Sequence, residues 1–304
     1  MQTLRTPDEC FADLPDFDYE PHYADVPDGE GGLLRMAWVE AGPPSGQVVL
    51  LLHGEPSWSF LYRKMLPVLA EAGFHALAPD LVGFGRSDKP TQISDYTYAR
   101  QVEWTRALVF DVLNLHDVTL VCQDWGGLVG LRLAAENPDR FARIVAANTG
   151  LPTGDVDMPE IWHLFREAVM TAPVMDIGRF VQSGCLHPMS DEVRAAYDAP
   201  FPAEEYKAAA RAMPGLVPIR PDDPASDANR TAWDFLTKSE SPMLVAFSDG
   251  DPITGAMAPI LQAVMPGAAG RTHPTVAGAG HFLQEDAGEE LAGYVVDFIN
   301  STPR

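Results

Sequence analysis

The fold of this chain is decided by the stretch Val118-Thr-Leu-Val-Cys-Gln-Asp-Trp-Gly-Gly-Leu-Val-Gly130. Its first residues favour β-structure, and the residues from Gly126 to Ala135 are small or helix-forming. The pattern predicts a strand that turns abruptly into a helix, with Asp124 at the bend. An aspartate at this position is also explained as a simple helix N-cap, because Asp is a favourable N-cap residue.

A side chain held between a strand and a helix resembles the nucleophile elbow of the α/β-hydrolase fold, which has the pattern G-x-S-x-G. Here the spacing is kept as Cys122-x-Asp124-x-Gly126, so a carboxylate occupies the nucleophile position. An Asp carboxylate, with an ordinary pKa of about 3.9, is anionic at neutral pH and attacks an sp3 carbon without a base to deprotonate it. The expected intermediate is an alkyl ester on the protein.

Strand and helix patterns alternate on both sides of this stretch. The apolar run Val48-Val-Leu-Leu-Leu52 has the length and composition of a central parallel strand that is covered on both faces. Further strands are expected at 34–40, 74–78, 141–147, 242–247 and 271–277, and helices at 62–72, 97–115 and 288–299. The alternation predicts an α/β fold with a mainly parallel central sheet flanked by helices.

The strand pattern stops between about residues 149 and 241. Helical patches at 160–170, 191–197 and 203–213 are separated there by proline-rich turns. We expect this segment to form a helical cap over the carboxyl edge of the sheet, where open α/β sheets bind ligands. The chain is therefore divided into a first core part (1–148), a cap (149–241) and a second core part (242–304).

The composition, with 46% hydrophobic and 21% charged residues, is ordinary for a globular protein. A net charge of −22 disfavours binding to nucleic acid or to anionic membranes, both of which need clustered Lys and Arg. The amino terminus shows no signal-peptide pattern, and no apolar run approaches the roughly 20 residues of a membrane span. The three cysteines have no metal-binding spacing. These features predict a cytoplasmic protein with free thiols.

A histidine and an acid are needed to complete a catalytic site. His281 lies in the glycine-rich loop Ala277-Gly-Ala-Gly-His281, and its late place matches the order nucleophile, acid, histidine of this fold. The acid is expected after the preceding strand, where Asp249 and Asp251 both lie. An Asp-Gly turn explains Asp249 without catalysis, so Asp251 is favoured. The other place for an acid, at the end of the strand before the cap, holds the neutral Asn148.

Two further features offer hydrogen-bond donors that can stabilise negative charge formed during a reaction. The loop His53-Gly54-Glu55-Pro56 follows a central strand, so the backbone N–H of Glu55 can form an oxyanion hole with that of Trp125. The indole N–H of Trp125 is a donor only, which suits a departing halide ion that accepts hydrogen bonds but no proton. Packing is the alternative explanation for Trp125, because tryptophan is large and usually well buried.

Several stretches together resemble the haloalkane dehalogenases, in the subfamily whose catalytic acid follows the later strand. They are His53-Gly-Glu-Pro-Ser-Trp-Ser-Phe-Leu-Tyr-Arg-Lys-Met65, Pro79-Asp-Leu-Val-Gly-Phe-Gly-Arg-Ser-Asp-Lys-Pro90, Gln123-Asp-Trp-Gly-Gly127 and Ala199-Pro-Phe-Pro202. With Arg5-Thr-Pro-Asp8, the resemblance covers nearly the whole chain. It implies Asp124 as the nucleophile, His281 as the base and Asp251 as the supporting acid.

The resemblance also implies two halide-binding indoles. Trp125 is the first, and the second belongs to the first cap helix, where Trp162 matches in Glu160-Ile-Trp-His-Leu164. Trp233 is the competitor, although it lies late in the cap. The implied reaction is hydrolysis of an alkyl halide to an alcohol, a halide ion and a proton, without a metal or other cofactor. The expected partners are a small halogenated alkane, water and the halide product, and the expected state is a monomer.

Two other functions remain as alternatives. An epoxide hydrolase shares the fold and the Asp nucleophile, but it usually protonates the ring oxygen with two cap tyrosines. This cap offers Tyr197 and Tyr206 only, and Glu55 replaces an aromatic residue after His-Gly, which also disfavours this function. A binding protein of the same fold that has lost turnover is the second alternative. The complete set of nucleophile, base and acid argues against it.

Overall fold

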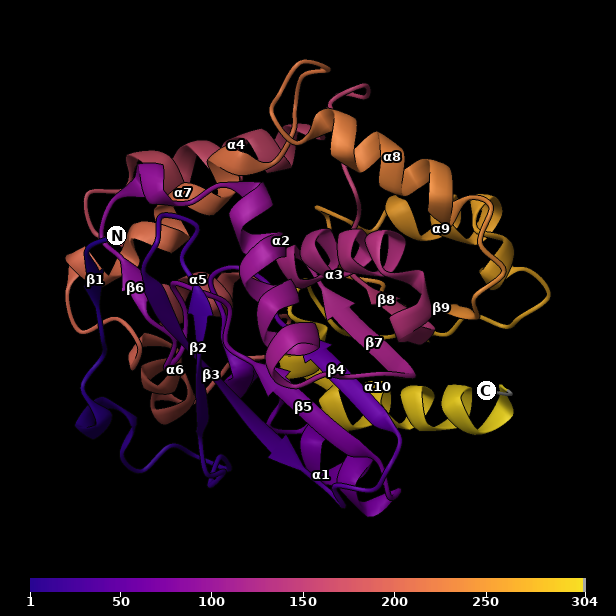
Figure 1. The fold of residues 1–304 in the computed structure, drawn as a ribbon, viewed down its shortest axis with the longest axis horizontal. Coiled ribbons are helices and arrows are strands. Elements are labelled where there is room, and N and C mark those ends of the chain that lie inside the picture. Colours follow the sequence, from indigo (N-terminus) through magenta and orange to yellow (C-terminus); the bar gives the residue numbers. More distant parts are fainter. Residues whose placement is uncertain (303–304) are drawn as a thin grey trace.

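The computed structural model describes residues 1–302, and its central sheet has the strand order β2-β3-β5-β4-β7-β8-β9 (Figure 1). The bounds are β2 His22–Pro27, β3 Leu33–Ala41, β5 His75–Pro79, β4 Val48–Leu52, β7 Val118–Gln123, β8 Phe141–Ala147 and β9 Met243–Val245. Strands β5, β4, β7, β8 and β9 run parallel to one another. Strand β3 is antiparallel to both β5 and β2, and these two strands, β3 and β2, form one edge of the sheet. The mainly parallel sheet that the sequence predicted is confirmed.

Helices cover both faces of this sheet (Figure 1). The core helices are α1 Met65–Glu71, α2 Tyr98–Arg106, α3 Trp125–Glu136, α9 Met257–Val264 and α10 Leu283–Ser301. α1 packs against α10, and α2 packs against α3. Every residue of β7 is buried, as is expected for a strand with helices on both sides. The pattern of continuous apolar residues therefore located the centre of the sheet.

Several shorter elements complete the core. Strand β1 Thr3–Leu4 pairs with β6 Lys89–Pro90, and β10 Phe247–Ser248 pairs with β11 Thr275–Val276. Single turns of 3-10 helix are η1 Asp8–Phe11, η2 Ser59–Tyr62, η3 Ile93–Asp95, η5 Pro138–Arg140 and η7 Pro266–Ala268, and a π-helical segment, η4 Ala107–Val112, follows α2. The strand expected at 242–247 is thus divided into β9 and β10, and the strand expected at 271–277 is shorter than predicted.

The last helix also begins earlier than predicted, at Leu283 instead of residue 288. Ala287 has non-helical backbone angles, which produce a kink inside α10. The periodic pattern restarts after this kink, and for that reason the sequence revealed only the second half of the helix.

The segment between β8 and β9 is helical. It contains α4 Glu160–Thr171, α5 Ile177–Ser183, α6 Asp191–Asp198, η6 Glu204–Lys207, α7 Ala208–Leu216 and α8 Ser226–Leu236. In Figure 1, α4, α7 and α8 lie along the side of the molecule toward which β7 points. The helical patches expected at 160–170, 191–197 and 203–213 correspond to α4, α6 and η6 with α7, whereas α5 and α8 were not predicted.

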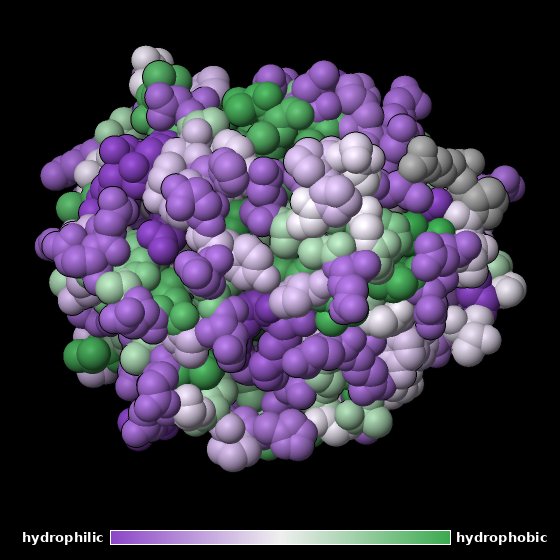
Figure 2. All heavy atoms as spheres, turned by 90° about the horizontal axis from the view of Figure 1, so that it is seen from below, coloured by the Kyte–Doolittle hydropathy of each residue, from purple (hydrophilic) through white to green (hydrophobic). Residues whose placement is uncertain are grey.

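The surface is largely polar. Figure 2 shows a face on which hydrophilic residues surround scattered apolar ones, in keeping with the net charge of −22. Across residues 1–302, no helix combines the length and apolar character that crossing a membrane requires.

Candidate active site

Asp124 lies between the end of β7 and the start of α3 in a strained backbone conformation. Its φ of +49° and ψ of −124° are sparsely populated by residues other than glycine, at a cost of about 1–3 kcal/mol. Two hydrogen bonds hold this backbone. The Asp124 N–H donates to the carbonyl of Asn148 at 3.0 Å, and the Thr149 hydroxyl donates to the Asp124 carbonyl at 2.8 Å. The sharp turn predicted from the sequence is present.

Glycines are required where the backbone around Asp124 is most crowded. A Cβ at Gly126 would lie 1.9 Å from the carbonyl oxygen of Leu52, and a Cβ at Gly54 would lie 2.4 Å from Cβ of Asp124. The loop after β4 is therefore pressed directly against the Asp124 side chain. Glu55 uses this proximity, because its backbone N–H donates to Oδ1 of Asp124 at 2.8 Å.

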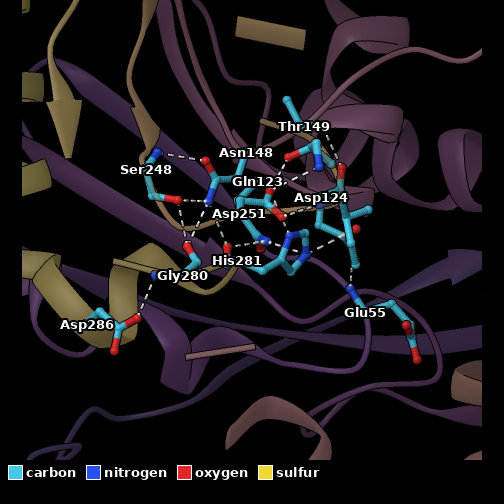
Figure 3. Close-up of polar contacts among 12 residues, drawn as sticks. Glu55, Gln123, Asp124, Asn148, Thr149, Ser248, Asp251, Gly280, His281 and Asp286 are labelled. Carbon is cyan, nitrogen blue, oxygen red and sulfur yellow. Dashed lines mark hydrogen bonds and ion pairs between the residues drawn. The ribbon is translucent and has the colours of Figure 1, made fainter. Parts of the chain in front are cut away.

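His281 lies between two carboxylates (Figure 3). Its Nδ1 is 3.1 Å from Oδ2 of Asp251, and its Nε2 is 3.5 Å from Oδ2 of Asp124. Asp251 is fixed in turn by the backbone N–H groups of Ile253 and Thr254, at 2.9 and 3.2 Å, and by the Thr254 hydroxyl. The structure thus brings together the three side chains that the sequence predicted.

The competing acid, Asp249, lies elsewhere. Its side chain is exposed and accepts a hydrogen bond from the backbone N–H of Gly278 at 2.9 Å. Asn148, at the alternative acid position, donates to the Ser248 hydroxyl at 2.8 Å and to the carbonyls of Gly280 and His281 at 2.9 and 3.1 Å. Asn148 therefore fixes the backbone of the histidine loop, a contact that the sequence did not reveal.

The charges around His281 shift its proton equilibrium strongly. Burial lowers its pKa, but the carboxylates of Asp251 and Asp124 outweigh burial and raise the pKa of His281 to about 10. Burial raises the pKa of Asp251, but the His281 charge and the Thr254 and Ile253 donors lower it to about 2. Loss of the Asp124 charge would therefore lower the pKa of His281.

Glu55 has a side chain whose environment the sequence did not predict. It is buried, and within residues 1–302 its Oε1 has no hydrogen-bond partner. Burial and the nearby Asp124 charge raise the pKa of Glu55 well above its ordinary value. A protonated side chain is neutral, so it leaves the charge of Asp124 without a second carboxylate to repel it.

A cavity of about 1070 Å³ opens above Asp124. Trp125 and Trp162 both line it, and among the described residues neither indole N–H has a hydrogen-bond partner. Trp233 also lines the cavity, but its N–H donates to the carbonyl of Leu151 at 2.5 Å. Of the three indoles in the cavity, those of Trp125 and Trp162 therefore have an N–H without a partner among the described residues.

The cap tyrosines do not reach this cavity. Tyr197 is fully buried and donates its hydroxyl to Glu285 at 2.6 Å, and neither Tyr197 nor Tyr206 is among the described residues that line the cavity. Within the same residues, no group of three or more His, Cys, Asp and Glu side chains is arranged to hold a metal ion. Asp124, Trp125 and Trp162 therefore line the cavity, and the His281–Asp251 pair adjoins Asp124 through the 3.5 Å contact between His281 and Asp124.

Several known proteins that resemble this chain over most of its length are haloalkane dehalogenases. The family model described as the alpha/beta hydrolase fold matches residues 47–288. The haloalkane dehalogenase of Psychrobacter cryohalolentis is 52% identical over 304 residues, which is 100% of both chains. That of Mycobacterium marinum is 49% identical over 98% of this chain and 100% of its own. The tetrameric haloalkane dehalogenase DpaA of Paraglaciecola agarilytica superposes with a TM-score of 0.90 at 34% identity, covering 97% of each chain.

Proposed function

Since the chain belongs to the haloalkane dehalogenases of the α/β-hydrolase fold, we propose that it hydrolyses carbon–halogen bonds through an alkyl ester on Asp124. The fold, the family and the enzyme class expected from the sequence are confirmed by its relatives.

In the first step, Asp124 displaces the halide. Glu55 N–H holds Oδ1, so Oδ2, with its longer 3.5 Å contact to His281, is the oxygen that attacks the carbon that bears the halogen. A C–O bond forms as the C–halogen bond breaks in line, and the electron pair leaves with the halide. The unpartnered N–H groups of Trp125 and Trp162 donate to the departing ion. Donors placed where charge develops are the most effective form of electrostatic catalysis.

In the second step, water attacks Cγ of the ester while its proton passes to Nε2 of His281. The N–H groups of Glu55 and Trp125 stabilise the charge on Oδ1. Breaking the bond between Cγ and Oδ2 then releases the alcohol, which takes the proton from His281. Asp251 holds Nδ1 and stabilises the imidazolium. Alkylation has already removed the Asp124 charge, so the His281 pKa falls as the base is needed.

One observation carries this proposal: a single imidazole spans the 3.5 Å contact to Asp124 and the 3.1 Å contact to Asp251. The test is to incubate the protein with panels of bromoalkanes and epoxides and to follow halide and diol together. We expect bromide release without diol formation. Diol formation without halide release would favour the epoxide hydrolase, and the absence of both would favour a binding protein without turnover.

Other expectations from the sequence remain predictions. The division into core and cap at residues 149 and 241 agrees with the position of α4 to α8 between β8 and β9, and excision of the cap with a folding assay would test it. DpaA is described as tetrameric, so sedimentation analysis is needed to test the expected monomer. Cell fractionation would test the expected cytoplasmic location. We also propose a role in detoxification, which growth on haloalkanes would test.

A further inference from the structure

Gln123 is the last residue of β7 and directly precedes Asp124. Its side chain is fully buried. Its Nε2 lies 3.1 Å from Nε2 of His281 and 3.2 Å from the backbone carbonyl oxygen of the same residue (Figure 3). Its Oε1 is buried without a hydrogen-bond partner in the described part of the chain. The amide is therefore committed to His281.

The orientation of this amide follows from the carbonyl of His281. A carbonyl oxygen only accepts hydrogen bonds, so the Gln123 atom that faces it is the NH₂ group. The same nitrogen faces Nε2 of His281 and has a second hydrogen to donate. Nε2 must then present its lone pair, and Nδ1 carries the proton toward Asp251. Gln123 and Asp251 thus select the same tautomer from opposite sides of the ring.

We propose that Gln123 is a positioning residue for ester hydrolysis, which holds neutral His281 with its lone pair on Nε2 and its ring fixed between Asp124 and Asp251. This inference rests on the proposed function, because it concerns the step in which His281 takes a proton from water. The tautomer with its lone pair on Nε2 is the form of His281 that this step requires, and water replaces Gln123 at this lone pair when the proton is transferred.

The charges that face His281 favour its protonated form, whereas the Gln123 amide favours the neutral form. Asp251 at Nδ1 and Asp124 at Nε2 both favour the imidazolium, and the pKa of Glu55, which is raised by burial beside Asp124, is itself lowered in part by the His281 charge. An imidazolium has a hydrogen on Nε2 and cannot accept from Gln123. Alkylation of Asp124 removes one of the opposing charges, and Gln123 then favours the neutral base. Gln123 therefore affects the hydrolysis of the ester and not the release of halide.

The test compares the wild type with Gln123→Met, which keeps the side-chain length but removes both donors. Titration of the His281 ring nitrogens by ¹⁵N NMR should show a pKa about one unit higher in the variant, because the net worth of a hydrogen bond is of that size. In rapid-quench experiments the halide burst should keep its rate. Ester hydrolysis at neutral pH should slow about tenfold, and the loss should diminish as the pH rises.

Two further variants make the result decisive. Gln123→Glu keeps the shape but places an anionic acceptor at Nε2, so it should raise the His281 pKa further than Gln123→Met does. It also keeps the test possible if the methionine variant does not fold. Thr119→Val is the matched control, because Thr119 is buried on the same strand and its hydroxyl has no partner among the described residues. We expect it to leave the His281 titration unchanged.

The outcomes separate this inference from the proposed function. An unchanged His281 pKa and an unchanged pH profile of ester hydrolysis in Gln123→Met would overturn the inference and leave Gln123 as a packing residue. A slowed halide burst in a folded variant would overturn it too, because the residue would then act on Asp124. Failure of the wild type to release halide would refute the proposed function instead.

Discussion

The hydroxyl of Tyr197, on helix α6, donates a 2.6 Å hydrogen bond to Oε2 of Glu285, on the last helix of the core. Glu285 also accepts hydrogen bonds from both terminal nitrogens of the Arg63 guanidinium, at 2.5 and 2.6 Å. All three side chains are buried. A buried ion pair that is completed by a tyrosine therefore joins the helical segment to the core. Tyr197 is committed to this contact, which removes it from the chemistry of the cavity.

Breaking this ion pair should destabilise the whole protein. Glu285→Gln leaves the Arg63 guanidinium buried without its charge partner, and we expect a loss of about 3–5 kcal/mol. Tyr197→Phe removes one hydrogen bond to a charged group, and we expect a smaller loss of about 1.5–3 kcal/mol. Urea denaturation at pH 7 measures both. Equal losses in the two variants would contradict the central role of the ion pair.

The stability that Glu285 contributes should depend on pH. Burial raises the pKa of Glu285, but Arg63 and Tyr197 outweigh it and lower the pKa in the folded protein. A lowered folded pKa gives stability that is present above the unfolded value of about 4.3 and is lost as the pH falls below it. Wild-type stability should therefore decline below that pH more steeply than that of Glu285→Gln.

The ester intermediate should be trappable in His281→Gln. The first step needs only an ionised Asp124, whereas the second needs a base, so this variant should release about one halide per protein and then stop. Mass spectrometry should locate the alkyl group on the peptide that contains Asp124. An unmodified peptide after a measured burst would contradict the covalent mechanism.

Asp251 and Asp249 should respond differently to the same substitution. Asp251→Asn removes the carboxylate that orients His281 and stabilises the imidazolium, so turnover should fall by orders of magnitude. Asp249→Asn alters an exposed turn and should leave turnover nearly unchanged. Steady-state kinetics of both variants decide the assignment, and the reverse pattern would show that Asp249 is the acid.

Trp162 and Trp233 should also differ in halide binding. Trp162→Phe removes an indole donor that faces the cavity, and it should weaken chloride or bromide binding about ten- to a hundredfold. Trp233→Phe removes a donor already committed to Leu151, so halide binding should persist. Quenching of tryptophan fluorescence by halide measures both constants. Intact binding in Trp162→Phe would identify it as a packing residue.

The volume of the cavity predicts a dependence on chain length. A cavity of about 1070 Å³ exceeds the need of a two-carbon halide. Each methylene that leaves water contributes about 0.8 kcal/mol, so kcat/KM should rise about fourfold per carbon from 1-bromopropane to 1-bromohexane. Val217→Phe should flatten this trend at its long end, because Val217 lines the cavity. A flat series in the wild type would show that the apolar wall does not contact the substrate.

The sheet was predictable because its central strands are buried on both faces and consist of continuous apolar residues. Helix α8 was not, because polar residues occupy the first half of its buried side. Ser226 bonds to the Arg220 carbonyl and Asn229 to the Pro152 carbonyl, and these contacts replace apolar packing. Helix α5 is only seven residues long and contains Gly178, which lies close to the backbone of Arg194. A helix of seven residues is too short to show a clear apolar periodicity, and in α8 the buried apolar residues Ala232 and Leu236 occupy only the second half of the helix.

The site was predictable where a residue follows a strand or keeps a known order along the chain. This describes Asp124, Asp251 and His281, which occupy loops at the carboxyl ends of strands. The contact between Gln123 and His281 joins residues 158 positions apart, and the one between Trp233 and Leu151 joins residues 82 apart. Such contacts depend on side-chain directions in the folded protein, and local sequence patterns contain no record of them.

The helices α4 to α8 are inserted between two strands that are direct neighbours, with Ala146 opposite Val245. Both ends of the insertion therefore meet the core at one place, and its length has no effect on the register of the sheet. Recombination or directed evolution can replace this segment as a module and change which substrates enter, while Asp124, His281 and Asp251 stay in the core. A transplanted module has to preserve the contact between Tyr197 and Glu285 and, for the proposed halide site, an indole at the position of Trp162.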